Sequence, residues 1–160
     1  MRREFEDGSV VYFAEEHAPL IVNGFIGRPT LESARFVQDT SEKIFVEYGE
    51  RYGACYNVVD GRRAERPDAL VRRFWAESAQ KPSAGATKYL RGTLVVIDNA
   101  ILRGVLTAVG WVSPQAREFE VMATIDEAID EARKRLEAAG CSLPPRVPFI
   151  EPDDPHRAMG

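Results

Sequence analysis

An aspartate and three arginines follow the most strand-like stretch of this sequence. Residues 56–61 read Tyr-Asn-Val-Val-Asp-Gly, and Arg62, Arg63 and Arg66 come directly after them. Asp60 could act as an acid or base or bind a cation, although an aspartate before glycine more often caps the next turn, and we favour the cap. The arginines could hold an anion where a helix begins, or they could be solvated and paired with neighbouring acids.

Other residue types that carry chemistry are scattered along the chain. The two histidines, His17 and His156, lie on a predicted turn and in a Pro-rich tail, so no rigid element places either one beside a nucleophile. Cys55 and Cys141 lack the paired spacing of zinc ligands. Glycine patterns that cradle nucleotide phosphates are absent. We therefore expect no catalytic residues, no metal site and no cofactor, and we predict that the protein is not an enzyme.

Composition indicates one globular domain with an uneven charge. The chain has 160 residues, 44% of them hydrophobic, and a net charge of −4, which disfavours nucleic-acid binding. Residues 60–91 nevertheless hold eight bases against four acids, whereas residues 1–50 hold ten acids against five bases. The basic skew is either a set of solvated faces or a patch for an acidic partner. Two cysteines and no apolar leader favour a cytoplasmic location.

The pattern of apolar residues predicts an α/β fold with a five-stranded mixed sheet and four helices. An opening hairpin is followed by helices that connect parallel strands. Strands are expected at 8–16, 20–26, 53–60, 86–90 and 119–122. Helices are expected at 31–48, 67–80, 94–112 and 124–136.

Several residues predict where these elements begin and end. Thr124 and Glu127 form a capping-box pattern at the start of the last helix, and Gly49 is placed to end the first one. Four prolines after Cys141 predict an extended or disordered tail. We therefore expect a domain at 8–140 and a Pro-rich C-terminal tail at 141–160.

The predicted helix Leu94–Val112 is apolar on most of its faces. Asp98 and Arg103 within it would be costly in lipid, so we expect no transmembrane span. A helix that is apolar all round needs cover on more than one side. That cover could be the Pro-rich tail, a second copy of the chain in a homodimer, or a ligand or partner.

Three stretches carry a family resemblance: the strand at 56–60, the helix Pro67–Glu77, and the final helix at 124–136. With the order of elements, they resemble the STAS domain of anti-sigma-factor antagonists and its CRAL-TRIO-like relatives, over residues 8–139. The resemblance implies protein–protein switching through phosphorylation of a Ser or Thr just after the third strand. Residues 61–67 contain no hydroxyl side chain, so that switch cannot operate here, whereas docking can.

We therefore predict a STAS-like, non-catalytic regulatory module that docks a protein partner through the loop after the third strand. The alternative is a small carrier of an apolar, lipid-like ligand. The residues expected to bind the partner are Asp60, Gly61, Arg62, Arg63 and Arg66. The residues expected to contact a ligand or a second copy are Ile97, Ile101, Val105 and Trp111.

Overall fold

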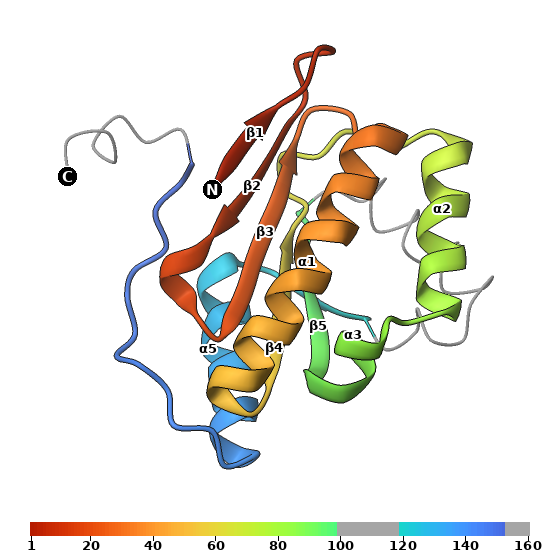
Figure 1. Ribbon diagram of the computed structural model, residues 1–160. Coiled ribbons are helices and arrows are strands. Elements are labelled where there is room, and N and C mark those ends of the chain that lie inside the picture. Colours follow the sequence, from red (N-terminus) through yellow and green to blue (C-terminus); the bar gives the residue numbers. More distant parts are fainter. Residues whose placement is uncertain (99–118, 153–160) are drawn as a thin grey trace.

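The sheet has six strands rather than the five that the sequence predicts. A computed structural model describes residues 1–98 and 119–152 (Figure 1). The strands are β1 Arg2–Glu4, β2 Val10–Ala14, β3 Leu20–Ile26, β4 Cys55–Asp60, β5 Leu90–Val96 and β6 Phe119–Met122. The helices are α1 Leu31–Tyr52, α2 Ala69–Gln80, α3 Ala84–Tyr89 and α5 Ile125–Ala138, with a 3-10 turn at Glu15–His17. The additional strand is β1, whose three exposed charged residues show none of the apolar alternation that predicts a strand.

Strands follow one another across the sheet in the order of the sequence. β1, β2 and β3 pair antiparallel, and β3, β4, β5 and β6 pair parallel. The predicted opening hairpin and the parallel strands after it are therefore confirmed, in a mixed sheet. The three parallel pairings place the carboxyl ends of β3, β4 and β5 at one edge of the sheet, so the loops that follow these strands lie there.

Helices cover both faces of the sheet. In Figure 1, α1 crosses in front of the sheet while α5 lies behind it. α1 packs on a cluster that includes Phe13, Ile21 and Cys55, and α5 packs on another that includes Leu20 and Val58. Because neighbouring residues on a strand point to opposite faces, the central strands β3 and β4 are apolar on both sides and form the centre of the protein.

Helix α1 is one turn longer than predicted. Gly53 ends it in the left-handed region, at φ 87°, where glycine has no steric penalty. Gly49, the predicted end, lies within the helix, and a Cβ there would be 2.0 Å from the Tyr89 ring. Gly49 therefore serves a close contact between α1 and α3, which local sequence cannot distinguish from a helix cap.

The region 84–98 also differs from its prediction. Residues 84–89, predicted to be mostly strand, form the short helix α3, and the Ser83 hydroxyl accepts a hydrogen bond from the Ala86 N–H at 3.0 Å. Residues 94–96, predicted to begin a helix, complete β5. Leu94 and Val96 are fully buried there, because β5 is an interior parallel strand covered on both faces. The rest of the predicted helix, residues 99–112, lies outside the described residues.

The side chain of Tyr12 reaches across strand β3 to contact Asp60 at the end of β4. Tyr12, Gly24 and Asp60 lie side by side on β2, β3 and β4, so Tyr12 and Asp60 are two strand spacings apart, about 10 Å. The Tyr12 ring passes over Gly24, and its hydroxyl donates a hydrogen bond to Asp60 Oδ2. A Cβ at position 24 would be 2.7 Å from the Tyr12 hydroxyl and from the Asp60 carbonyl oxygen. Glycine is therefore required at position 24 for this contact.

We expect Gly24→Ala to lower the free energy of unfolding by about 3 kcal/mol, since the new methyl group overpacks the site and displaces Tyr12. Tyr12→Phe should cost about 2 kcal/mol by removing a hydrogen bond to a charged group. Urea denaturation of both variants and of their combination measures the coupling between the two sites. In Gly24→Ala the hydrogen bond is already broken, so the double variant should lose less than the sum. Additive losses would contradict this account of Gly24.

Candidate functional site

Asp60 lies at the end of β4 and is 1% exposed. Its Oδ1 accepts hydrogen bonds from the Arg62 backbone N–H at 3.1 Å and from Arg62 Nε at 2.9 Å. Its Oδ2 accepts from Arg62 Nη2 at 2.7 Å and from the Tyr12 hydroxyl. The guanidinium thus binds the carboxylate with two parallel hydrogen bonds. The turn cap that the sequence favours is present, with a side-chain ion pair added to it.

The charge of Asp60 is set by two opposing effects. Burial raises the pKa of its carboxyl and is the largest effect, but the hydrogen bonds from Arg62 and Tyr12 together outweigh it and hold the pKa below its usual range. Burial, and then the charge of Asp60, raise the pKa of Tyr12 well above its usual range. Asp60 is therefore ionised and its oxygens are committed to internal donors. A group in this state is a structural anion and a poor general base.

The loop after β4 is fastened to the neighbouring strands. The Gly61 N–H donates to the Val96 carbonyl oxygen at 2.9 Å. Gly27 donates to the Arg63 carbonyl oxygen at 3.1 Å and accepts from the Glu65 N–H at 2.9 Å. These backbone bonds hold the loop against the ends of β3 and β5, so its side chains extend from a rigid support.

The outer side of this loop is covered by the chain's own C-terminal segment, residues 141–152. Arg62 Nη2 donates to Glu151 Oε1 at 2.8 Å, and Arg63 Nη2 lies 3.5 Å from Glu151 Oε2. The Phe149 ring lies 5.9 Å from the Arg62 guanidinium and 6.0 Å from the ring of the buried His17. Sequence reasoning expected Arg62 and Arg63 to face a partner, and here they hold an acidic side chain of the same molecule. Of the predicted arginines, Arg66 is exposed.

Of the residues predicted to contact a ligand or a second copy of the chain, one lies in the core and three lie outside the described residues. Ile97 is 4% exposed and belongs to a small cluster with Val95, Val59 and Phe119. Ile97 is therefore a core residue and offers no contact surface, because it follows a buried parallel strand rather than lying on an exposed helix. The other three residues of the group are Ile101, Val105 and Trp111, which lie outside the described residues.

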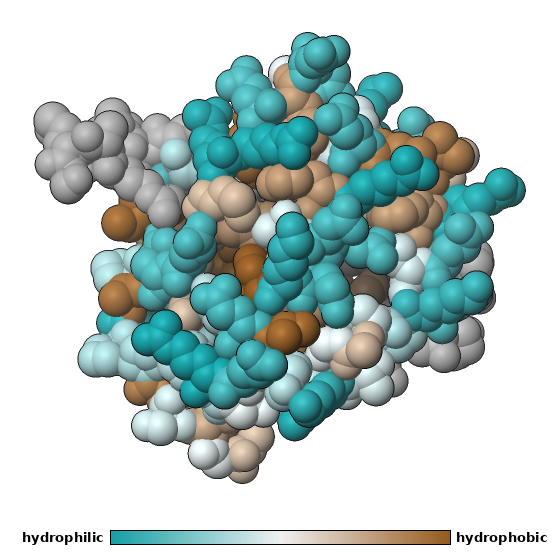
Figure 2. Space-filling view, viewed as in Figure 1, coloured by the Kyte–Doolittle hydropathy of each residue, from teal (hydrophilic) through white to brown (hydrophobic). Residues whose placement is uncertain are grey.

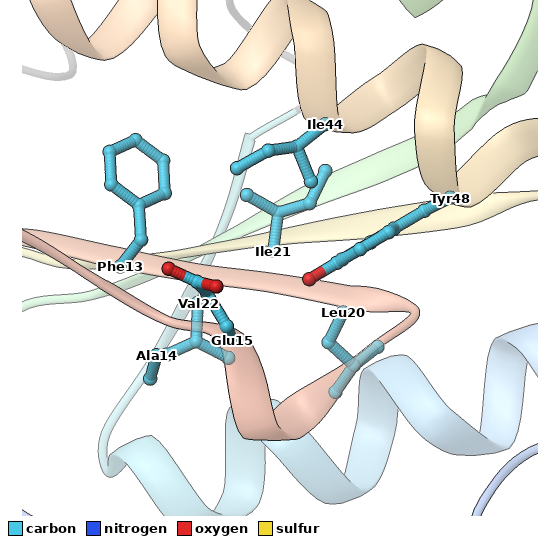
Figure 3. A pocket seen from close by; sticks show the side chains of 8 residues that line it. All are labelled: Phe13, Ala14, Glu15, Leu20, Ile21, Val22, Ile44 and Tyr48. Atoms are coloured by element: carbon cyan, nitrogen blue, oxygen red, sulfur yellow. The ribbon is translucent and has the colours of Figure 1, made fainter. Parts of the chain in front are cut away.

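A shallow hollow with no enclosed space for even a water molecule lies between β2, β3 and α1, and Figure 3 shows the Glu15 carboxylate and the Tyr48 hydroxyl among its lining side chains. Burial, and then the charge of Glu15, raise the pKa of Tyr48 to about 12. Sites for small organic ligands usually measure about 300 to 1,000 Å³. This hollow is therefore too small for a lipid-like ligand. Its lining residues are Phe13, Ala14, Glu15, Leu20, Ile21, Val22, Ile44 and Tyr48.

The visible surface is mainly hydrophilic. Figure 2 shows teal side chains over the face that carries α1 and α2, interrupted by separate brown patches. The most exposed large apolar residues of the described chain are far apart in the sequence: Met1, Leu70, Val121 and Ile150. Within residues 1–98 and 119–152, no helix has both the length and the apolar character needed to cross a membrane. The same ranges contain no group of three acidic, histidine or cysteine side chains placed to hold a metal ion.

Sequence reasoning missed the residues that complete this site. Tyr12, Phe149 and Glu151 come from β2 and the C-terminal segment, far in sequence from Asp60. One local signal was available, because Gly24 interrupts the apolar strand at 20–26, and a glycine within a strand often marks a close approach. Nothing in the tail sequence distinguishes Glu151 from the acids that follow it.

Comparison with known proteins gives one structural match. No protein-family model matches this chain, and no curated protein matches it. A solved structure described as "Crystal Structure of an Anti-sigma Factor Antagonist from Mycobacterium paratuberculosis" aligns with 82% of this chain and 99% of that chain, at 16% sequence identity and a TM-score of 0.49. Similarity at this level does not bear on what this chain binds.

We expect Asp60→Asn to lower the free energy of unfolding by about 3 kcal/mol at pH 7, because the amide removes the buried charge that accepts two hydrogen bonds from the Arg62 guanidinium. The pKa of Asp60 is lowered in the folded state, so its charge stabilises the protein above the unfolded pKa of about 3.9 and that stabilisation is lost as the pH falls through the folded value. The difference between wild type and variant should therefore shrink below about pH 4.

Urea denaturation at pH 7 and at pH 3 measures both quantities. Asp68→Asn is the matched control: Asp68 is an exposed N-cap of α2, and asparagine caps helices equally well. A difference between wild type and Asp60→Asn that does not depend on pH would show that the charge of Asp60 is not the stabilising feature.

Proposed function

We propose that this protein is a non-catalytic regulatory module of STAS-like fold that docks a protein partner through the loop 60–66 and the start of α2. The observation that carries the proposal is the pair of contacts from Arg62 and Arg63 to Glu151, because it places an acidic side chain from a distant segment on this loop. A rigid, basic loop of this kind favours an acidic partner surface.

The chemistry of the loop also supports a docking role over catalysis. Asp60 is buried and fully hydrogen-bonded, and its task is to orient Arg62. Arg66 adds a positive charge on the exposed side of the loop. Residues 61–67 have no hydroxyl group to phosphorylate, so regulation at this loop must come from another source than a phosphate added there. Homodimerisation and a cytoplasmic location remain proposals with this function.

The alternative function, a carrier of an apolar ligand, has no observation in its favour among the described residues. The hollow beside Tyr48 is too small. Ile97 is packed within the core. We therefore do not propose a lipid-carrier function.

We expect Arg63→Glu/Arg66→Glu to reduce capture of the partner by about tenfold or more, because charge reversal at a complementary interface costs at least 1.4 kcal/mol. The measurement is quantitative mass spectrometry of proteins captured on immobilised full-length chain. Arg35→Glu/Lys43→Glu makes the same change in net charge on exposed positions of α1 and should capture as wild type does. If both double variants capture the partner equally well, the partner docks at a site other than this loop.

A further inference from the structure

The C-terminal segment runs as an extended strap along α5 and then along the β2–β3 hairpin. Figure 1 shows it, in blue, leaving α5 and passing the 3-10 turn between β2 and β3. Residues 141–151 form neither helix nor strand. Prolines at 144, 145 and 148 favour such an extended chain, because they fix φ and cannot donate to a sheet. The strap is therefore already in the shape in which a peptide binds to a surface.

Two groups of contacts hold the strap. The first is on α5: Arg146 Nη2 lies 2.6 Å from Asp126 Oδ1, its Nε lies 2.7 Å from Asp130 Oδ1, and Arg133 Nη2 donates to the Pro144 carbonyl oxygen at 2.7 Å. The carboxylates of the first group are exposed, at 65% for Asp126 and 62% for Asp130, and ion pairs of this kind contribute little each. The first group aligns the strap along α5, where Leu143 also packs on the apolar cluster.

The second group lies at the loop after β4 and is more specific. Phe149 packs on the apolar cluster beneath α5 and stacks on the buried His17. Two residues later, Glu151 contacts the guanidinium groups of Arg62 and Arg63. Because Arg62 is held by two bonds to the buried Asp60, its position does not depend on Glu151. The site thus has an apolar part for a ring and a fixed cationic part for a carboxylate.

We propose that this surface is a recognition site for an extended peptide segment with an aromatic residue two positions before an acidic one, and that Phe149 and Glu151 occupy it in cis until a partner with the same pattern displaces them. The inference rests on the proposed docking function and deepens it, because it names the chemistry of the partner and the source of regulation. The strap supplies the regulation at a loop that has no hydroxyl side chain to phosphorylate.

Tethering makes the strap an effective competitor. A segment joined to its own site by a short connection has an effective concentration in the millimolar range, so a free peptide competes poorly against it. The apparent affinity of the wild-type chain is reduced by the fraction of molecules in which the site is open. Weakening the strap should therefore raise the affinity for an added peptide without changing the site itself.

The experiment uses the full-length chain and a fluorescein-labelled peptide that copies residues 143–152, Leu-Pro-Pro-Arg-Val-Pro-Phe-Ile-Glu-Pro. Fluorescence anisotropy measures binding to the wild type and to Phe149→Ala/Glu151→Arg. We expect the variant to bind the peptide about tenfold more tightly than wild type, because its site is open. Glu137→Arg, at an exposed position of α5 that belongs to neither group of strap contacts, makes the same charge change and should bind as wild type does.

Two further measurements keep the proposal falsifiable. A peptide with arginine in place of its glutamate should not bind the variant. Glu151→Gln preserves the shape of the strap and should bind the peptide with an affinity between those of wild type and the double variant. It replaces the double variant in the test if that variant does not fold. Equal binding by wild type and variant, or binding of the charge-reversed peptide, would overturn the proposal.

Failure of this proposal and failure of the proposed function give different results. If no peptide binds while partner capture still depends on Arg63 and Arg66, the loop is a docking site and the strap is only structural. If the peptide binds the opened variant while capture is unaffected by those arginines, the site and its strap are real but the partner docks elsewhere.

Discussion

A carboxylate buried at the end of the central strand β4 is the constraint on which the rest of this structure depends. Desolvation of Asp60 would be costly, and the charge is tolerated because Arg62 and Tyr12 supply donors for both oxygens. Meeting that need determines three features together. Gly24 must have no side chain, Tyr12 must cross β3, and Arg62 must turn back over the end of β4.

The same interaction preorganises the Arg62 guanidinium at the end of β4. Arg62 would otherwise be a long, mobile side chain on a loop, and ordering such a chain costs conformational entropy. Asp60 holds it in one orientation while a quarter of its surface remains exposed, at 24%. A carboxylate from outside can therefore bind without first ordering the arginine. In the structure that carboxylate is Glu151, so the preorganised arginine faces the protein's own C-terminal segment.

Local patterns predicted the elements whose character is set within a few residues. The N-cap at Thr124, whose hydroxyl accepts from the Glu127 N–H, and the apolar face of α5 were correct, as were the hairpin and β4. The errors occur where contacts with residues distant in the sequence decide the secondary structure. Residues 84–89 are helical because Gly85 and Tyr89 pack on α1, and 94–96 are strand because β4 and β6 flank them. An apolar run reads alike as a buried strand or a buried helix.

By itself, the sequence determined that an aspartate ends a buried strand and that arginines follow it, because alternation and turn chemistry are local properties of the chain. It also determined that the loop 61–67 has no hydroxyl side chain that could be phosphorylated. Only the tertiary structure decided what those residues contact. Tyr12 lies 48 residues from Asp60 and Glu151 lies 89 residues from Arg62. These contacts depend on the order of the strands and on the path of the tail. Neither can be read from a short window of sequence.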